Sequence, residues 1–279
     1  MDVDVVGLLR LHGLAVSDAQ ILQRDDVSMV VRCETDRGAV VLKAKTEAER
    51  PATEYATQQL FSDAGLPVAP LVGHGQEPIA HIVLGWVEGT PLSSTSSVTA
   101  QRHAGDLLRR VHERGGGPPY AGNDTWDGWM KGWLNHALPW WRDTGGAEAS
   151  MVDAAWSGYR ALQPLLATRG AQFILFDGRP EHFLVADDRV VGIIDLELAR
   201  GGDGAMDLGV MAVSDPALLQ EVLAGYAADG EESETLDRLI PFYVFLRRLA
   251  AAEWKLTRGE KTEGERILQL LRSHPIPAA

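Results

Sequence analysis

Three side chains that could move protons and bind a metal lie around two strand-like apolar runs in the second half of the sequence. Asp177 stands on the segment that leads in, His182 directly precedes the first run, and Asp195 ends the second. If the two runs pair through the turn between them, His182 and Asp195 meet at the far end of the hairpin, with Asp177 on the loop before it. Two groups that can ligate a metal beside a third carboxylate suit phosphoryl transfer, in which the carboxylate accepts the proton of an attacking hydroxyl.

The same residues also have plainer interpretations. Asp177 and Asp195 could be ordinary turn acids that flank a hairpin, because short motifs also match by chance. His182 could be a structural histidine whose ring nitrogens are hydrogen-bonded within the protein.

Composition favours a globular enzyme or binding protein and argues against polyanionic partners. The chain has 279 residues, 45% hydrophobic content and a net charge of −13. Nucleic acid and anionic membranes both require a basic surface, so we expect neither as a partner. The acidic balance is compatible with a cationic small substrate, and it could equally serve solubility alone.

The start of the chain and its cysteine content predict a cytoplasmic protein. The first residues include aspartates where a secretory signal carries lysines, and no apolar run reaches membrane-spanning length. Cys33, the only cysteine, lies in an apolar run and cannot form an internal disulfide. We expect a monomer or a homodimer.

The elements that must position the chemical groups follow a simple order. Residues 21–45 predict three strands separated by turns, and residues 66–75 and 79–89 predict two more. A helix is expected between these groups, from about residue 47 to residue 65, and a short amphipathic helix at 4–14.

Helical patterns dominate after residue 98, apart from the hairpin. The predicted fold class is therefore α+β. We expect a small antiparallel-sheet lobe at 1–88, a hinge near 85–89, and a larger, mainly helical lobe at 89–279.

The residues around the hairpin resemble a known catalytic loop. Residues 175–182 read LFDGRPEH, and residues 194–197 read IDLE. This order is similar to that of the aminoglycoside phosphotransferase/choline kinase family, a small-molecule branch of the protein-kinase fold. There the loop reads His-Gly-Asp-Leu-His-Pro-Gly-Asn and the hairpin ends in Ile-Asp-Trp. The resemblance implies a two-lobed protein-kinase-like fold in which Asp177 is the catalytic base and His182 and Asp195 hold Mg²⁺.

Other segments extend the resemblance over nearly the whole chain. Lys43 ends a strand where the family keeps a lysine that contacts nucleotide phosphates, and Glu54 stands in the next helix where the ion-pair partner of that lysine belongs. Lys45 is the alternative phosphate contact. Asp203 and Asp207, in ARGGDGAMDLG, fall where the family has structural acids that tie the following helix to the catalytic loop.

The resemblance also places the nucleotide-binding residues. The hinge whose backbone binds an adenine edge falls on Gly85, Trp86 and Val87, and Ser28 is the candidate phosphate-contacting hydroxyl of the nucleotide-covering turn. Glu197 could join the outer shell of the metal, contact the substrate, or be a plain polar residue.

Three departures from the family pattern leave a second interpretation open. Leu175 and Phe176 replace the His-Gly before the catalytic aspartate, and His182 replaces an asparagine. The nucleotide-covering turn reads RDDVS, in which Asp25 and Asp26 would repel phosphates unless they point to solvent or toward the metal. These changes motivate the alternative of a pseudokinase that binds a nucleotide or another ligand without transferring phosphate.

The tryptophan-rich helical region is the candidate acceptor site. Trp126, Trp129 and Trp133 recur at helical spacing, which favours core packing, but some of them could line an acceptor pocket. Asp124 and Asp127 beside them could pair with a substrate amine.

Together these observations predict an enzyme that uses ATP (or GTP) and Mg²⁺ to phosphorylate a hydroxyl of a small molecule. The resemblance suggests an antibiotic-type acceptor, such as an aminoglycoside, another amino sugar or a nucleoside. A metabolic kinase acting on an amino alcohol or a sugar is the nearest alternative.

Overall fold

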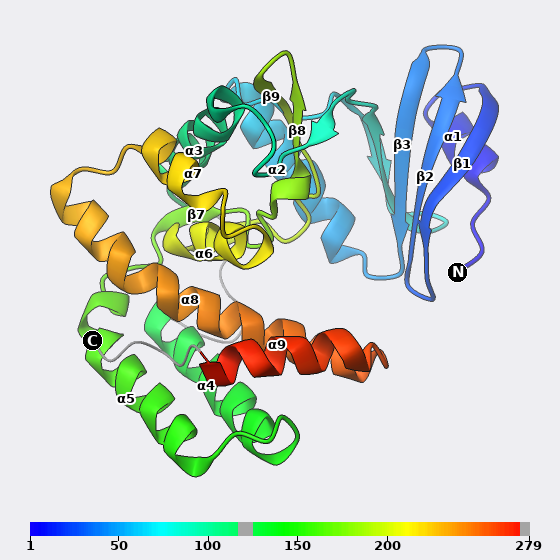
Figure 1. Ribbon diagram of the computed structural model, residues 1–279. Helices are drawn as coiled ribbons and strands as arrows, with labels where there is room; N and C mark the ends of the chain where they lie inside the picture. The colour runs from blue at the N-terminus through cyan, green and yellow to red at the C-terminus, as the bar shows by residue number, and fades with distance from the viewer. Residues whose placement is uncertain (117–124, 274–279) are drawn as a thin grey trace. The chain divides into compact units, whose positions relative to one another are not determined.

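The computed structural model describes residues 1–116 and 125–273 and separates into two compact units. The first combines Met1–His103 with Glu181–Ala199, and the second combines Ala104–Pro180 with Arg200–Ala279. An antiparallel sheet dominates the first unit, and helices dominate the second (Figure 1). This is the α+β class predicted from the sequence.

The first unit is built on a five-stranded antiparallel sheet with the strand order β1-β2-β3-β5-β4 (Figure 1). The predicted strands are all present, as β1 (Val16–Arg24), β2 (Ser28–Thr35), β3 (Gly38–Lys45), β4 (Leu71–Gly75) and β5 (Ala80–Gly85). Consecutive strands β1, β2 and β3 pair with their neighbours because short turns join them.

Alternation along β3 sends its side chains to two different environments. Leu42 and Ala44 belong to a hydrophobic core that also contains residues of α1 (Val5–Leu11) and β2. Val41 and Lys43 therefore point to the opposite face of the sheet, because successive strand residues alternate between faces. Lys43 is thereby directed away from the hydrophobic core that contains Leu42 and Ala44.

The helix α2 (Glu49–Asp63) packs against β3, β4 and β5. Its buried side chains include Glu54 and Phe61. Gly65 follows the end of the helix with a φ of +64°, a left-handed conformation that glycine adopts without strain. The helix and its end lie where the sequence predicts them.

The predicted hairpin is also present, and its strands are β8 (Phe183–Ala186) and β9 (Arg189–Ile193). Asp187 and Asp188 form its two-residue turn with φ values of +48° and +60°. Two successive left-handed residues match the strand twist of a hairpin. Phe183 lies opposite Ile193, so the residues just outside the hairpin, His182 and the segment after Ile193, are adjacent.

Long-range contacts attach this hairpin to the sheet unit. The Ile193 N–H donates to the carbonyl of Pro67 at 2.7 Å, and β6 (Thr90–Pro91) pairs with β8. A Cβ on Gly192 would lie 2.8 Å from a methyl carbon of Val87, so glycine permits the hinge segment to pack directly on β9. These contacts explain why the hairpin belongs to the first unit although its sequence neighbours belong to the second.

Helix α8 is central to the second unit, where it packs against α4, α5, α6 and α9. The elements from residue 98 on, besides the hairpin, are α3 (Val98–His112), α4 (Trp126–Asp143), α5 (Ala149–Leu166), β7 (Gln172–Ile174), the 3₁₀ turn η1 (Pro180–His182), β10 (Arg200–Gly202), α6 (Ala205–Ser214), α7 (Leu219–Tyr226), α8 (Gly230–Thr257) and α9 (Lys261–Ser273). Figure 1 shows α9 running beside α8.

A buried polar network joins α4, α8 and the segment before α6. The carboxylate of Asp203, with no exposed surface, accepts hydrogen bonds from Arg169 at 2.7 Å and from the Tyr243 hydroxyl at 2.6 Å. The indole N–H of Trp126 donates to the same Tyr243 hydroxyl at 2.7 Å. Asp203 thus fixes Arg169 and Tyr243, whereas within the described chain its carboxylate makes no hydrogen bond to the loop at 175–182.

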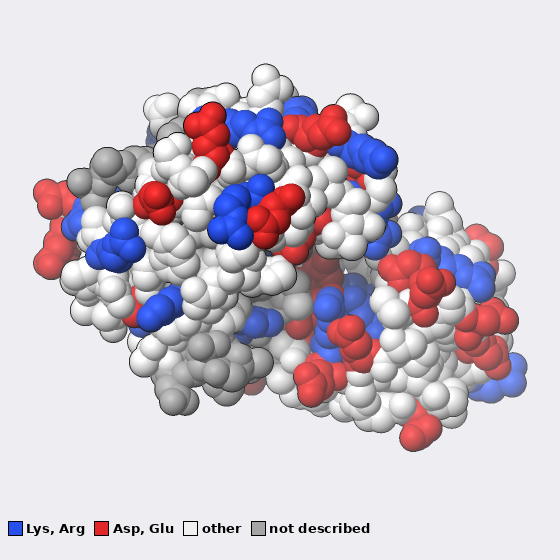
Figure 2. Space-filling view, turned by 90° about the horizontal axis from the view of Figure 1, so that it is seen from below, with Lys and Arg blue, Asp and Glu red and all other residues white. Residues whose placement is uncertain are grey.

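Surface charge is mixed on the face drawn in Figure 2, where Lys and Arg side chains are interspersed with Asp and Glu side chains. Among the helices of the described residues, none combines the length and the apolarity that a membrane span requires.

A histidine pair in the first unit generates a pH prediction. The Nε2 atoms of His12 and His81 lie 2.9 Å apart, and burial together with His81 and His74 lowers the pKa of His12. The unfolded chain therefore binds a proton at this position more readily than the folded chain, so stability falls as the pH drops below the ordinary value near 6.5. We expect the thermal unfolding midpoint to fall between pH 7.5 and pH 5.5, and to fall less in His12→Gln.

The matched control is His136→Gln, since His136 lies on the surface of α4 with 68% of its side chain exposed. Its pH dependence should equal that of the unmodified protein. An equally steep loss of stability in His12→Gln would contradict the prediction.

Candidate active site

A buried ion cluster stands at the centre of the first unit. The ammonium group of Lys43 lies 2.6 Å from a Glu54 oxygen and 3.0 Å from an Asp195 oxygen. Lys43 is 9% exposed and Glu54 is 1% exposed. The structure therefore brings β3, α2 and the segment that follows β9 together around one cation.

Electrostatics keeps this cluster charged. Burial alone would lower the pKa of Lys43, but the carboxylates of Glu54 and Asp195 outweigh burial and raise it. Burial would raise the pKa of Asp195, whereas Lys43 and His182 lower it to about 2. Lys43 is consequently a cation and Asp195 an anion near neutral pH.

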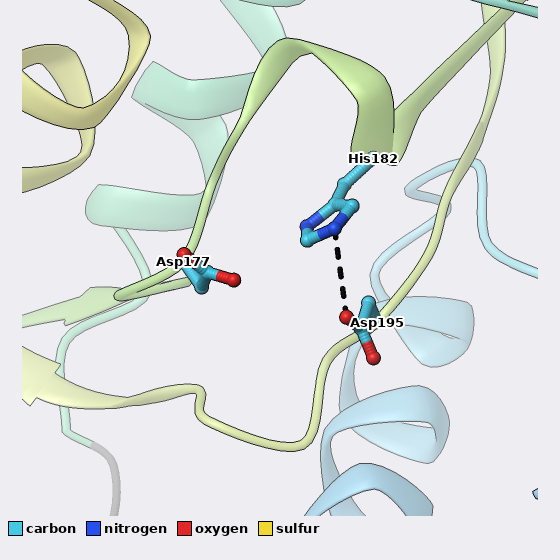
Figure 3. Close-up of side chains that lie close together, drawn as sticks. All are labelled: Asp177, His182 and Asp195. Atoms are coloured by element: carbon cyan, nitrogen blue, oxygen red, sulfur yellow. Dashed lines mark ion pairs between the residues drawn. The ribbon is translucent and has the colours of Figure 1, made fainter. Parts of the chain in front are cut away.

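Asp195 is held in a strained backbone conformation beside His182. Its φ is +62°, a region that non-glycine residues rarely adopt and that is over-represented at functional sites. Figure 3 shows the ring of His182 directed at the Asp195 carboxylate, with Nε2 3.5 Å from one oxygen. The backbone N–H of Ile194 donates to the carbonyl of His182 at 2.9 Å, which fixes the two segments together.

The Asp195 carboxylate of this unit fits a magnesium ion. Carboxylate oxygens of Glu54, Asp195 and Glu197 lie within 4.8 Å of one another. Mg²⁺ in nucleotide sites takes one or two carboxylates and completes its shell with phosphate oxygens and water. Asp195, with 35% of its side chain exposed and its carboxylate ionised, meets that requirement.

An apolar cavity of about 320 Å³ opens beside Lys43. It includes the predicted hinge and residues from β1, β2, β3, β5 and the hairpin, and its lining is Leu22, Val30, Val41, Lys43, Ala69, Leu84, Gly85, Trp86, Val87, Gly89, Pro91, Leu184 and Ile194. Within the described chain, the backbone N–H of Val87 makes no hydrogen bond. The cavity therefore combines apolar walls, a polar hinge edge and a cation.

The turn between β1 and β2 is closed by its own aspartate. The Asp25 carboxylate accepts the N–H groups of Val27 at 2.9 Å and Ser28 at 2.7 Å, and the Ser28 hydroxyl at 2.9 Å. These bonds, first among them that from Val27, lower the pKa of Asp25 to about 2. The Ser28 hydroxyl thus donates its hydrogen bond within the turn. Asp26 is exposed.

The second candidate lysine has different partners. Lys45 forms an ion pair with Glu197, which also accepts a hydrogen bond from Arg50 at 3.0 Å. The structure therefore pairs Glu54 with Lys43 rather than with Lys45, and it pairs Glu197 with Lys45 and Arg50.

In the second unit, Asp177 is held by two arginines. Arg247 of α8 donates to one carboxylate oxygen at 3.0 Å, and Arg179 donates to the other at 3.1 Å. The loop backbone before it is fixed by Asp207, which accepts the N–H groups of Leu175 at 2.7 Å and Phe176 at 2.8 Å. Asp207 thus ties α6 to the loop, the role that the family resemblance implies.

An aromatic cluster lies next to Asp177. The ring of Phe176 is 5.4 Å from that of Trp129 and 6.3 Å from that of Trp133, and the guanidinium of Arg200 lies 4.6 Å from its centre. Trp129 and Trp133 are partly exposed, whereas Trp126 is 1% exposed and belongs to the core network. Packing therefore accounts for Trp126.

The two acids expected to bind an amine have different outcomes. Asp127 accepts hydrogen bonds from the Tyr159 hydroxyl at 2.6 Å and from Gln163 at 3.1 Å, so its carboxylate joins α4 to α5. Asp124 lies outside the described residues.

Sequence reasoning missed the arginines beside Asp177 and Phe176. Arg247 lies four residues after the fully buried Tyr243, on the apolar face of α8, and a charged residue on such a face was the available signal. No comparable signal marked Arg179 or Arg200.

Comparisons with known proteins place these residues in context. A family model described as the phosphotransferase enzyme family matches residues 23–242. Similar solved structures include a thermostable mutant of aminoglycoside phosphotransferase APH(4)-Ia in a ternary complex with ADP and hygromycin B, at 15% identity and a TM-score of 0.72, covering 96% of both chains. Macrolide 2′-phosphotransferase MphH from Brachybacterium faecium is similar at 18% identity and a TM-score of 0.64, covering 95% of both chains.

A third similar structure is spectinomycin phosphotransferase APH(9)-Ia in complex with ADP and spectinomycin. It is 15% identical with a TM-score of 0.67, and the match covers 96% of this chain and 93% of that one. A search of curated proteins found no match. At these identities the likeness shows a shared fold.

The ion cluster generates a stability prediction. Lys43→Met leaves the Glu54 carboxylate buried without its closest cation, which should cost about 3–5 kcal/mol of unfolding free energy. Chemical denaturation measures this loss, and adding Glu54→Gln should recover much of it because the buried charge is then removed.

Lys45→Met is the matched control. Arg50 still neutralises Glu197 in that variant, so its loss should be clearly smaller. Equal losses in the two lysine variants would show that the Lys43 pair is not the stabilising one.

Proposed function

We propose that this chain, which belongs to the phosphotransferase enzyme family, transfers the terminal phosphoryl group of ATP or GTP to a hydroxyl of a small molecule. The observation that carries the proposal is the buried Lys43–Glu54–Asp195 cluster beside an apolar cavity. Such a cluster offers a fixed cation and a metal-binding carboxylate to a polyphosphate.

The first unit supplies the nucleotide site in this proposal. The base of the nucleotide occupies the cavity and accepts a hydrogen bond from the Val87 N–H at the Gly85–Val87 hinge. Lys43 binds the phosphates, and Glu54 keeps the lysine oriented and charged. Because the ammonium is already in place, little reorganisation is needed when the phosphates arrive.

Asp195 and His182 would hold the magnesium ion. When bound, the ion neutralises phosphate charge and aligns the terminal phosphoryl group. The ion pair with Lys43 keeps the Asp195 carboxylate ionised, and the hydrogen-bonded backbone of His182 and Ile194 keeps the two ligands adjacent.

Asp177 is the base in the proposed reaction. The acceptor oxygen forms a bond to the terminal phosphorus, the bond from that phosphorus to the bridging oxygen of the nucleotide breaks, and the hydroxyl proton moves to an Asp177 oxygen. Arg247 and Arg179 fix the orientation of the carboxylate. Asp177 and His182 are five positions apart in the sequence, so their Cα atoms are at most about 18 Å apart in any arrangement of the units.

For the acceptor we carry forward the antibiotic-type class of aminoglycosides, other amino sugars and nucleosides. The similar structures act on or bind compounds of this kind, namely hygromycin B, a macrolide and spectinomycin. A planar nucleoside suits the partly exposed rings of Trp129 and Trp133 beside Phe176. A metabolic amino alcohol or sugar is the alternative. The cytoplasmic location stays a prediction from the sequence.

A nucleotide-binding pseudokinase is the second candidate. The Asp25 carboxylate occupies turn N–H groups that would otherwise be available to a phosphate. A thermal-shift titration with Mg-ATP and Mg-GTP, followed by mass spectrometry of acceptors after incubation, separates the two candidates. Nucleotide binding without phosphate on any acceptor favours the pseudokinase.

The role of Asp177 generates a rate prediction. Asp177→Asn keeps the size of the side chain but cannot accept the proton, so turnover should fall by about a hundred- to ten-thousand-fold. Nucleotide binding should persist, and the unfolding midpoint should change little. A folded variant with full activity would exclude Asp177 as the base.

The turn generates a prediction on nucleotide affinity. Asp25→Asn retains an oxygen for the turn N–H groups while removing a negative charge, so the KM for the nucleotide should fall by about two- to five-fold, the modest effect of an exposed charge. Asp26→Asn is the control because Asp26 makes no such contact within the described chain and should change KM less. A higher KM in Asp25→Asn would show that the charge itself is required.

A further inference from the structure

Three guanidinium groups lie around Asp177 and the neighbouring Phe176. One carboxylate faces two guanidinium groups, those of Arg247 and Arg179, and Arg200 adds a third within 4.6 Å of the neighbouring Phe176 ring. The nearby Asp207 is fully buried and accepts the N–H groups of Leu175 and Phe176. It therefore serves the loop backbone rather than an incoming ligand.

Arg247 has side-chain N–H groups that can still donate to a ligand. A guanidinium has five N–H donors, and within the described chain the only side-chain hydrogen bond of Arg247 goes to Asp177. Its side chain is 20% exposed, so ligand access does not require unfolding. Burial lowers the pKa of Arg247, and Asp177 and Asp207 oppose that effect.

The aromatic cluster places a flat apolar surface beside this cation. The guanidinium of Arg247 lies 5.3 Å from the centre of the Phe176 ring, and Trp129 and Trp133 border the same ring. Asp127, the described one of the two acids expected to bind an amine, is already engaged by Tyr159 and Gln163. The described residues therefore offer the Arg247 guanidinium, which can bind an anion, together with aromatic ring surfaces. A polycation would instead need carboxylates that are available to it.

We propose that the acceptor carries an anionic group, a carboxylate or a phosphate, that binds Arg247 while an adjacent planar part of the acceptor contacts Phe176 and Trp129. The acceptor class is thus an anionic aromatic or heteroaromatic alcohol rather than a polycationic aminoglycoside. This inference rests on the proposed phosphotransfer, because it places the acceptor beside Asp177.

A purely positioning role of Arg247 makes different predictions. If Arg247 only held Asp177 in place, its loss would lower kcat for every acceptor by the same factor. If Arg247 binds the acceptor, its loss raises KM for anionic acceptors and leaves the KM for the nucleotide alone.

The test uses matched acceptor pairs with the full-length protein and Mg-ATP. Uridine 5′-monophosphate is compared with uridine. The carboxylate 4-(2-hydroxyethyl)benzoate, here called hydroxyethylbenzoate, is compared with its primary amide, 4-(2-hydroxyethyl)benzamide. An aminoglycoside supplies the polycation. Phosphorylated product is quantified by mass spectrometry and ADP release. We expect at least one anionic member to exceed its neutral partner in kcat/KM by about ten- to a hundred-fold, the usual effect of a charge-assisted hydrogen bond.

Variants at α8 separate acceptor binding from positioning. Arg247→Gln should abolish the preference for the anionic member, and Arg247→Lys should restore part of it because the charge returns without the bidentate geometry. Arg248→Gln is the matched control, since Arg248 is the adjacent, partly buried arginine on the same helix. It should keep the preference.

The possible outcomes distinguish this inference from the proposed function. Equal turnover of charged and neutral members, or preference for the aminoglycoside, overturns the inference and leaves phosphotransfer intact. If no acceptor is phosphorylated, the proposed function fails, and the inference is decided by tryptophan fluorescence titration without nucleotide. Tighter binding of uridine 5′-monophosphate or hydroxyethylbenzoate than of its neutral partner, lost in Arg247→Gln, supports it, and equal binding overturns it.

Discussion

The buried ammonium group of Lys43 is the interaction on which the first unit depends. A lysine that is only 9% exposed keeps its charge because two carboxylates, on α2 and after β9, lie within 3.0 Å of it. Those carboxylates come from segments far apart in the sequence. The sheet, α2 and the hairpin must therefore assemble together to bring the three charges into contact, and this requirement fixes the geometry of the ion cluster.

Local rules made much of this unit predictable. Alternating β-branched runs predicted β2, β3 and β5, and the turn at residues 186–188 predicted the hairpin that carries His182 and Asp195. The pairing of Lys43 with Glu54 followed from a resemblance in motif order rather than from periodicity. The family model agrees with that resemblance over residues 23–242.

Contacts between distant segments were not predictable. No local pattern shows that the hairpin contacts Pro67 and the hinge. The close approach of the hinge to β9 is possible because glycine, at Gly192, has no Cβ. The sequence shows two acids in the turn at Asp25, but not that Asp25 folds back onto the N–H groups of Val27 and Ser28. Arg247 likewise reaches Asp177 across 70 residues of chain, which only the tertiary packing of α8 determines.

The departure from the family loop at Phe176 has a physical consequence for the whole second unit. Phe176 stands where the resembled motif has glycine, and its φ of +66° is a conformation that strains a residue with a Cβ by about 1–3 kcal/mol. Asp207 offsets that strain by accepting two loop N–H groups, and the ring gains contacts with Trp129, Arg200 and Arg247. A glycine would release the strain but would remove the ring that holds the two arginines together. The strained residue therefore connects the loop that carries Asp177 to the charge and shape of the surface around it.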